Sequence, residues 1–427
     1  TTFAGPADRK LSSKCAKNKD TELQLVIGMF RHGARTPDLD QAKYFPKYKE
    51  INNKFEPYGP GALTTVGKEA MYYLGQSLRM RYAKSLYGIE TFEKDQIIME
   101  ATDYPRCLIS AYLVWGGLTD SDKDSLVQKD WNKFEKLKDL HNKEKEDLLK
   151  FYYEQPTCVA FMEKLEKTLK DRESDLGVCF SSFDLMKETL GVEKPNPFRV
   201  WEMYEIYKAQ KNAKVQLPCY ITNEVMEKME QCIENFLQIT FATTCMKKMS
   251  GGIYVDMVIK ECQEFIKLKD EDPKRLRLFC GHDTTIAPAV AALGGVGGYI
   301  RSGHTFLVDL PNYGSLILFE LHKDKIADEH FVKVFYLNGK EDCEPTELKI
   351  KDSPDDKLYL NDYIKLVEPV RINKEQLIEC SQSSQNKKAK AGVDVMKTIP
   401  KVKKVKNVWN QSACKKGTPR PNVEAKK

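Results

Sequence analysis

Short apolar runs alternate with helical patterns near the start of the chain. LQLVIGMF, residues 23–30, has no polar alternation and predicts a buried strand. From about Thr64 apolar side chains recur at helical spacing, and Thr64 or Thr65 is a suitable cap for that helix. QIIMEA, residues 96–101, predicts a second strand and runs into another helical stretch, CLISAYLVWGGL. Strand, helix, strand and helix in this order are typical of a parallel α/β sheet.

The pattern changes between about residues 120 and 250. Charged stretches in this region carry apolar residues three or four positions apart, which predicts helices with one apolar face. In one of them, NEVMEKMEQCIENFLQIT, Asn223 is a plausible N-cap. We expect a mostly helical insertion whose charge runs are solvated faces.

The α/β pattern returns near residue 275. RLRLFC, residues 275–280, predicts a strand, and GHDTTIAPAVAAL predicts a turn that leads into a helix. TFLVDL, SLILFEL and FVKVFYL predict three more strands, the last two as an antiparallel pair. The predicted fold class is therefore α/β, with a mainly parallel sheet core flanked by helices and a helical cap insertion.

The expected domain boundaries follow these changes in pattern. The parts are an N-terminal extension over residues 1–21, an α/β core over 22–119 and 251–380, a mostly helical cap insertion over 120–250, and a basic C-terminal tail over 381–427.

Charge is distributed unevenly between these parts. The whole chain has a formal net charge of +6 at pH 7, but residues 381–427 hold thirteen Lys and Arg against two acidic residues, a net charge of +11. The other 380 residues therefore carry −5. The tail has little hydrophobic content, so we expect a disordered or loosely docked arm able to contact polyanions or glycans. No recognition fold or aromatic platform indicates specific nucleic-acid binding.

The twelve cysteines are spread along the chain, without a CxxC pair or the spacing of metal ligands. A zinc ribbon or a thioredoxin motif is therefore disfavoured. The cysteines are either disulfides of a secreted protein or small buried hydrophobes, and we expect a mixture of both. Asn410 begins the one N-glycosylation sequon, which fits secretion. No apolar run is long enough to form a transmembrane segment.

Three predicted strands end in residues that could bind an anion. These residues are Arg31, His32, Arg35, Arg106, His282 and Asp283. Because ligands bind at the carboxyl ends of parallel strands, we expect both histidines at one edge of the sheet. Guanidinium groups suit phosphate oxygens, an imidazole can attack phosphorus, and an aspartic acid can protonate a leaving alcohol. Neighbouring arginines would disfavour protonation of His32 and keep its lone pair available.

Each of these features alone has an ordinary structural explanation. An arginine after a strand is usually a surface residue, RHG occurs by chance, and Asp283 and Thr284 could simply cap a helix. The joint pattern favours a phosphate pocket, because every component stands at the end of a predicted strand.

Several motifs resemble those of a known family. RHGARTP resembles the RHGxRxP signature of the histidine acid phosphatases, and GHDTT resembles the second, HD-containing motif of that family. ATDYPRCLISA is similar to the stretch that carries the third phosphate-binding arginine. The resemblance covers about residues 23–380 and is strongest to the animal prostatic, lysosomal and venom enzymes.

The resemblance implies a fold, a mechanism and a set of roles. The fold is phosphoglycerate mutase-like, with a helical cap over the pocket. His32 would be the nucleophile and form a phosphohistidine, and Asp283 would protonate the leaving oxygen. The residues that would clamp the phosphoryl oxygens are Arg31, Arg35, Arg106 and His282. No metal or other cofactor is implied, and an Asp that acts protonated predicts an acidic optimum.

The chain also departs from the family pattern. TDSDKDSLVQKDWNKFEKLKD replaces a segment rich in proline and tryptophan that helps to line the family's pocket. Cys158 and Cys380 match a pair that the family bridges, and Cys219 lies near another family cysteine without aligning to it.

Two functions follow from this comparison. The first is a secreted acid phosphatase for small phosphomonoesters, with the lysosome as the second choice of location. The alternative is a phosphatase-fold binding protein with little or no turnover. It would sequester small ligands, such as biogenic amines or lipid mediators, in saliva or venom.

Overall fold

The structure is a computed structural model. It describes residues 20–38, 45, 58–129, 131, 159–268, 274–339, 344–353 and 357–377. The expected pair Cys158 and Cys380, the sequon at Asn410 and the basic tail lie outside these residues.

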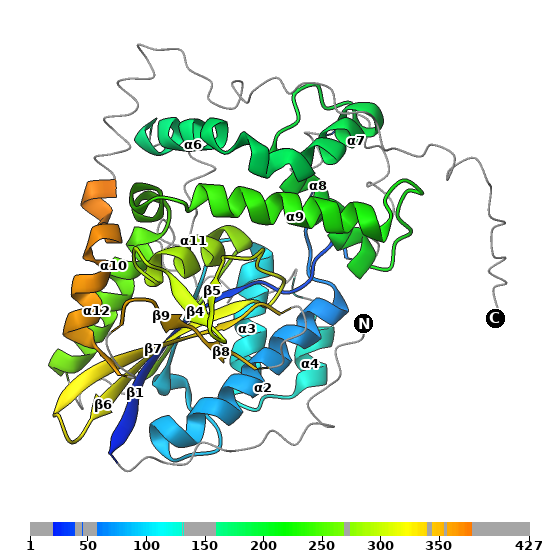
Figure 1. Ribbon diagram of the computed structural model, residues 1–427. Helices are drawn as coiled ribbons and strands as arrows, with labels where there is room; N and C mark the ends of the chain where they lie inside the picture. The colour runs from blue at the N-terminus through cyan, green and yellow to red at the C-terminus, as the bar shows by residue number, and fades with distance from the viewer. Residues whose placement is uncertain are drawn as a thin grey trace, which may run out of the picture.

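A seven-stranded sheet forms the centre of the molecule, in the order β10-β7-β6-β1-β3-β2 with β8 beside β7 (Figure 1). Its strands are β1 (Thr21–Arg31), β2 (Ile97–Ala101), β3 (Leu276–Gly281), β6 (Leu316–Asp324), β7 (Glu329–Leu337), β8 (Thr346–Glu347) and β10 (Leu358–Tyr359). β1 and β2 both run parallel to β3. β6 is antiparallel to β1 and to β7, so the predicted antiparallel pair is confirmed.

Helices cover both faces of this sheet. One layer contains α2 (Thr65–Tyr87), α3 (Pro105–Leu118) and α4 (Lys123–Gln128), and the other contains α10 (Thr244–Leu268), α11 (Asp283–Leu293) and α12 (Leu360–Val367). Alternate residues of β1 pack into the two layers. Leu25, Ile27 and Met29 enter the α10–α12 layer, whereas Val26 and Phe30 enter the α2–α3 layer. Burial on both sides explains why this strand has no polar alternation, and the α/β fold class is confirmed.

The expected starts of α2 and α9 are correct to within one residue. Thr64 caps α2, and its hydroxyl accepts a hydrogen bond from the Gly67 amide. The prediction of Asn223 as a cap is wrong. Thr222 has the extended backbone of an N-cap and accepts from the Val225 amide, so Asn223 is already the first helical residue of α9.

Between α4 and α10 the described chain is helical. The elements are α6 (Val159–Asp171), the 3-10 helix η5 (Glu173–Cys179), α7 (Phe180–Leu190), α8 (Pro197–Asn212) and α9 (Asn223–Thr240). They share a hydrophobic cluster that also takes in Ala287 and Ala291 of α11, and they lie together above α11 in Figure 1. A disulfide joins Cys179 to Cys232, and Cys219 is also disulfide-bonded. α10 then runs from this region into the sheet layer without a break.

A small three-stranded sheet contains β4 (Tyr299–Arg301), β5 (His304–Phe306) and β9 (Lys349–Ile350). The strand expected over residues 305–310 is therefore wrong beyond Phe306. The Val308 carbonyl instead accepts from the side-chain amide of Gln238 at 2.5 Å. Leu310 packs among the α6–α9 helices, so this segment serves the helical region and not the sheet.

Short 3-10 helices complete the described chain, η2 at Lys94–Gln96 and η7 at Glu368–Val370. Within the described residues, no helix combines the length and the apolar character needed to cross a membrane.

Candidate active site

The ends of the parallel strands bring the two histidines of the sequence motifs together. Arg31 pairs with Gly281 in the register of β1 and β3, so the residues that follow both strands are neighbours. The His32 amide donates to the Gly281 carbonyl at 3.1 Å. The imidazole rings of His32 and His282 lie edge to face with their centroids 5.5 Å apart. β2 ends on the other side of β3, and α3, which carries Arg106, begins four residues after it.

The loop after β1 is held by the start of α2. The Thr64 amide donates to the Ala34 carbonyl at 3.0 Å, and Arg35 forms an isolated β-bridge with Leu63. A Cβ on Gly67 would lie 2.0 Å from the Ala34 oxygen, so only glycine permits this approach. The first turn of α2 therefore sets the backbone from which Arg35 projects.

His32 is buried in a single hydrogen-bonded orientation. Its Nδ1 lies 2.9 Å from the Gly33 carbonyl oxygen, which can only accept, so Nδ1 carries the proton and Nε2 keeps the lone pair. Burial lowers the pKa of His32 well below its ordinary value, and the positive charges of Arg106 and Arg31 lower it further. Both effects favour the neutral form of His32. The neighbouring arginines lower the pKa of His32, as predicted from the sequence, but burial lowers it more.

Arg31 is only 1 % exposed and sits between two carboxylates. One terminal nitrogen lies 2.5 Å from Glu205 Oε2 and 3.0 Å from Asp283 Oδ2, and the other donates to the Pro311 carbonyl at 2.7 Å. The ring of Tyr313 lies 4.3 Å from the guanidinium. Burial opposes the charge on Arg31, but the carboxylates of Asp283 and Glu205 raise its pKa overall.

Arg106 is the third cation of the group. It stacks 4.6 Å above the Tyr104 ring and approaches Asp38 at 3.4 Å. Burial lowers its pKa, and the charge of Arg35 adds to this effect. The Nε–H groups of Arg31 and Arg106 are buried and have no acceptor among the residues that the structure describes. Buried donors of this kind are costly, so the arrangement fits an anion that would accept from them.

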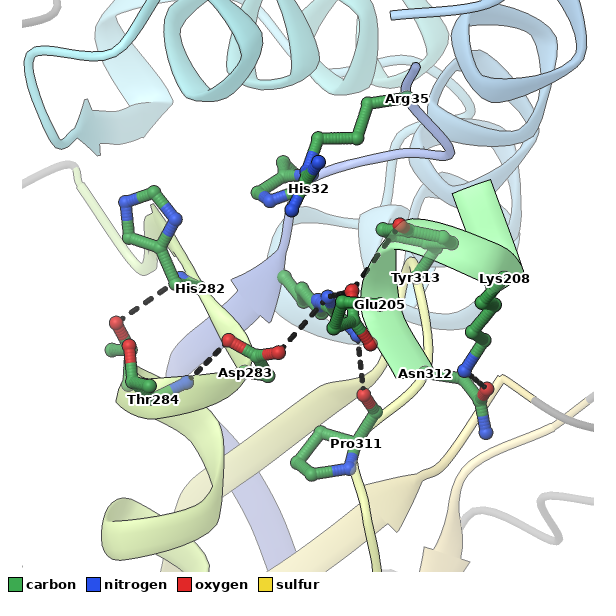
Figure 2. A network of polar contacts seen from close by, with 12 residues as sticks. His32, Arg35, Glu205, Lys208, His282, Asp283, Thr284, Pro311, Asn312 and Tyr313 are labelled. Carbon is green, nitrogen blue, oxygen red and sulfur yellow. Dashed lines mark hydrogen bonds and ion pairs between the residues drawn. The ribbon is translucent and has the colours of Figure 1, made fainter. Parts of the chain in front are cut away.

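His282 and Asp283 begin α11. The ring of His282 is held by the Thr102 hydroxyl, 3.0 Å from Nε2, and stands edge to face on Tyr104. The two oxygens of Asp283 have different roles, as Figure 2 shows. Oδ1 accepts from the Thr284 amide at 2.8 Å, a helix-start contact, while Oδ2 faces the Arg31 guanidinium.

Several side chains of this group were not predicted from the sequence. Glu205 and Lys208 reach it from α8, and Tyr313 and Asn312 reach it from the loop before β6 (Figure 2). Lys208 donates to the Asn312 side-chain oxygen, and Tyr313 donates to Glu205 Oε2 at 3.2 Å. A signal existed in the sequence, because Glu205 and Lys208 share a helix face with Trp201 and Tyr204.

Glu205 is buried and Lys208 is half-buried, so the expectation that the charges of the helical insertion are solvated is wrong for Glu205. Burial would raise the pKa of Glu205, but the charges of Arg31 and Lys208 outweigh it and lower the pKa to about 2. Burial lowers the pKa of Lys208 to about 8. In the part of the chain that the structure describes, no three His, Cys, Asp or Glu side chains are grouped as metal ligands would be.

This combination of fold and site defines the class of protein. A parallel α/β core that gathers two histidines and three arginines at its strand ends is the arrangement of a histidine phosphatase. The model of the histidine phosphatase superfamily (branch 2) matches residues 22–337, and the chain belongs to this family.

Known relatives support the same classification. The chain is 28% identical to venom acid phosphatase Acph-1 of Apis mellifera over 366 residues, which cover 84% of this chain and 87% of the relative. It is 28% identical to prostatic acid phosphatase of Mus musculus over 372 residues, with 85% and 90% covered. Lysosomal acid phosphatase of Xenopus laevis is 26% identical over 326 residues, with 74% and 70% covered.

Solved structures share the fold at low sequence identity. A Hafnia alvei phytase in complex with tartrate superposes with a TM-score of 0.59 at 16% identity, covering 83% of this chain and 98% of that chain. A Klebsiella phytase gives a TM-score of 0.58 at 14% identity, with 83% and 96% covered. These likenesses establish the architecture.

Proposed function

We propose that the protein hydrolyses small phosphomonoesters through a phosphohistidine on His32, with Asp283 as the proton donor. The observation that carries the proposal is the state of His32. Its Nδ1 donates to the Gly33 carbonyl, which leaves the lone pair on Nε2, and burial and the charges of three guanidinium groups lower its pKa. A phosphate bound by those cations would present its phosphorus to that nitrogen.

The reaction then has two displacements. Nε2 of His32 attacks phosphorus, and a nitrogen–phosphorus bond forms as the ester oxygen–phosphorus bond breaks. The Asp283 carboxylic acid gives its proton to the departing alcohol oxygen and becomes a carboxylate. A water molecule next attacks the phosphorus of the phosphohistidine, and an oxygen–phosphorus bond forms as the nitrogen–phosphorus bond breaks. The Asp283 carboxylate takes a proton from the water, and inorganic phosphate leaves. The groups proposed to hold the phosphoryl oxygens are Arg31, Arg35, Arg106 and His282.

The charge of the site favours this proposal over an amine-binding role. Arg31 is a buried cation and Arg106 and Lys208 are half-buried ones, and the first two have N–H groups without an acceptor among the described residues. An ammonium ligand would meet this positive charge, whereas a phosphate would neutralise it. A binding protein without turnover is the alternative, and an activity measurement separates the two.

The test is hydrolysis of p-nitrophenyl phosphate near pH 5 by the folded protein and by His32→Ala. We expect turnover by the first and none by the second. His330→Ala is a matched control, because His330 is a partly buried histidine on β7 whose contact is Gln24. Absence of turnover in the folded wild-type protein would exclude the proposed function. Calorimetry with amines and lipids would then test the alternative.

We also propose that the protein works outside the cytosol, in a secretion or in the lysosome. The Cys179–Cys232 disulfide supports this location, because such bonds persist in oxidising compartments. Relatives named for venom, prostate and lysosome support it too. Detection of the protein by antibody in the secreted fluid or in a lysosomal fraction distinguishes the two. Its detection in the cytosol alone excludes both.

A further inference from the structure

Glu205 belongs to the helical region but makes its contacts in the core. It projects from α8 and is 1 % exposed. Its Oε2 accepts from Arg31 at 2.5 Å and from the Tyr313 hydroxyl at 3.2 Å, and Figure 2 shows the contact with Tyr313 as a dashed line. Arg31 is separated from it by 174 residues in sequence. The ion pair therefore joins two distant parts of the chain at the proposed phosphate site.

Glu205 and Asp283 share one nitrogen of Arg31, at 2.5 and 3.0 Å. The two carboxylates have different chemical surroundings. Asp283 is the residue proposed to gain and lose a proton in each turnover. Glu205, with a pKa lowered to about 2 by Arg31 and Lys208 against the effect of burial, stays ionised throughout the acidic and neutral range. Arg31 thus has one permanent anionic partner and one that changes its charge.

We propose that Glu205 is a positioning residue for the proposed phosphatase reaction, which holds the Arg31 guanidinium in place while Asp283 changes its protonation state. The role rests on the proposed function. Without Glu205, the sole anionic partner that Arg31 has among these contacts is the proton donor itself. The Arg31 guanidinium would then move with the Asp283 side chain or bind it more tightly. Either change disturbs the geometry of proton transfer from Asp283.

Several charged and titratable groups surround Glu205. They are Arg31, Arg35, Tyr204, Lys208, Asp283 and Tyr313. Glu205→Gln removes one negative charge from this group. The ionised form of Asp283 then becomes more favourable, because Arg31 no longer divides its attraction between two carboxylates. The pH above which the proton donor is lost should therefore move downwards.

A purely structural role makes a different prediction. Glu205 could simply fasten α8 to the core, and its removal would then lower stability without altering the pH dependence of catalysis. The chain offers a matched control for this case. Glu261 of α10 pairs with Arg277 of β3, both buried, at the end of β3 opposite to the site.

The experiment compares the pH profile of kcat on an alkyl phosphomonoester, whose leaving alcohol needs a proton, for wild-type protein, Glu205→Gln, Glu205→Asp and Glu261→Gln. We expect the alkaline limb of the Glu205→Gln profile to move by about one unit to lower pH, with kcat reduced about 10- to 100-fold. Glu205→Asp retains the charge and should return the limb to its wild-type position. Glu261→Gln should lower the unfolding temperature and leave the limb unchanged.

The outcomes separate the two proposals. If wild-type protein turns over and Glu205→Gln loses stability with an unmoved limb, the positioning role is overturned and the phosphatase function stands. If folded wild-type protein shows no turnover, the proposed function fails and this role falls with it. Should Glu205→Gln not fold, Glu205→Asp and Glu261→Asp carry the test. Glu205→Asp should reduce kcat about tenfold or more, whereas Glu261→Asp should not. Equal kcat values for these two variants would refute the positioning role.

Discussion

His32 and His282 lie edge to face, with ring centroids 5.5 Å apart, although 250 positions separate them in sequence. The parallel pairing of β1 with β3 creates this relationship, because both strands end at the same level. Only the lone pair of His32 is directed by a backbone hydrogen bond, whereas the ring of His282 is held by the Thr102 hydroxyl. The two histidines therefore have separate roles in the proposed reaction.

His32→Ala and His282→Ala should differ in whether a covalent phosphoenzyme forms. His32→Ala removes the nucleophile and should give no covalent phosphoenzyme. His282→Ala retains the nucleophile and removes one donor to the phosphoryl group, so the phosphoenzyme should still form about 10²- to 10³-fold more slowly. Rapid quenching with a labelled phosphomonoester and phosphohistidine analysis provide the measurement. A phosphoenzyme in His32→Ala would assign the nucleophile to another residue.

Asp283→Asn should show a dependence on the leaving group. The amide cannot donate a proton, so esters of alkyl alcohols, which need protonation, should lose about 10²- to 10⁴-fold in kcat. p-Nitrophenyl phosphate should lose far less, because its phenolate leaves without a proton. Steady-state kinetics with both substrates check this. Equal losses for the two substrates would remove Asp283 from the role of proton donor.

Arg106→Ala should weaken the binding of inorganic phosphate. A charge-assisted hydrogen bond from a buried guanidinium contributes about 1.5–3 kcal/mol, which corresponds to a 10- to 100-fold higher inhibition constant for phosphate. Arg106→Lys keeps the charge and should be intermediate. Arg275→Ala is the control, since Arg275 lies at the opposite end of β3 against the Tyr87 ring. Unchanged phosphate inhibition in Arg106→Ala would place this cation outside the site.

Gly67→Ala should damage the site without touching a charged residue. The new Cβ would lie 2.0 Å from the Ala34 carbonyl oxygen, so α2 or the loop that carries Arg35 must move. We expect a loss of about 1–3 kcal/mol in unfolding free energy and at least tenfold in kcat/KM. Gly177→Ala meets no atom within 4 Å and should be close to neutral. Wild-type kinetics in Gly67→Ala would show that the loop tolerates a shift.

The ionised carboxylate of Glu205 should increase the free energy of unfolding above about pH 4.5. Its folded pKa of about 2 lies below its ordinary value of 4.5, so its ionised form stabilises the folded state. The contribution, up to about 3 kcal/mol, is fully present above pH 4.5 and disappears as the pH falls through 2. Thermal unfolding of wild-type protein and Glu205→Gln from pH 2 to 7 tests this. The gap between the two should be widest above pH 4.5, and a constant gap would contradict the shift.

Much of the candidate site could be predicted because its residues follow apolar runs directly. A run such as LQLVIGMF must be buried, and the residues that follow a buried strand emerge at its end. Arg31, His32, His282 and Asp283 are placed by this local logic, together with the rule that parallel strands end at a common edge. Secondary structure over β1, β3, α2 and α11 follows from the same periodicities.

One error arose where a distant side chain decided the local structure, and another at the exact start of a helix. The strand expected beyond Phe306 is absent because Gln238 of α9 takes the Val308 carbonyl. The cap of α9 is Thr222 and not Asn223, because a one-residue difference in backbone angles decides which side chain reaches the free amide.

The sequence by itself determined the strands, the helices that follow them and the cations and imidazoles at their ends, since these depend on periodicity and on neighbouring residues. Only the tertiary structure decided that Glu205 of α8 is the second carboxylate on Arg31. Periodicity places Glu205 on a helix face but does not say what that face packs against. Its partner Arg31 lies 174 residues away, and the positive charge of that partner, together with that of Lys208, outweighs burial and lowers the pKa of Glu205.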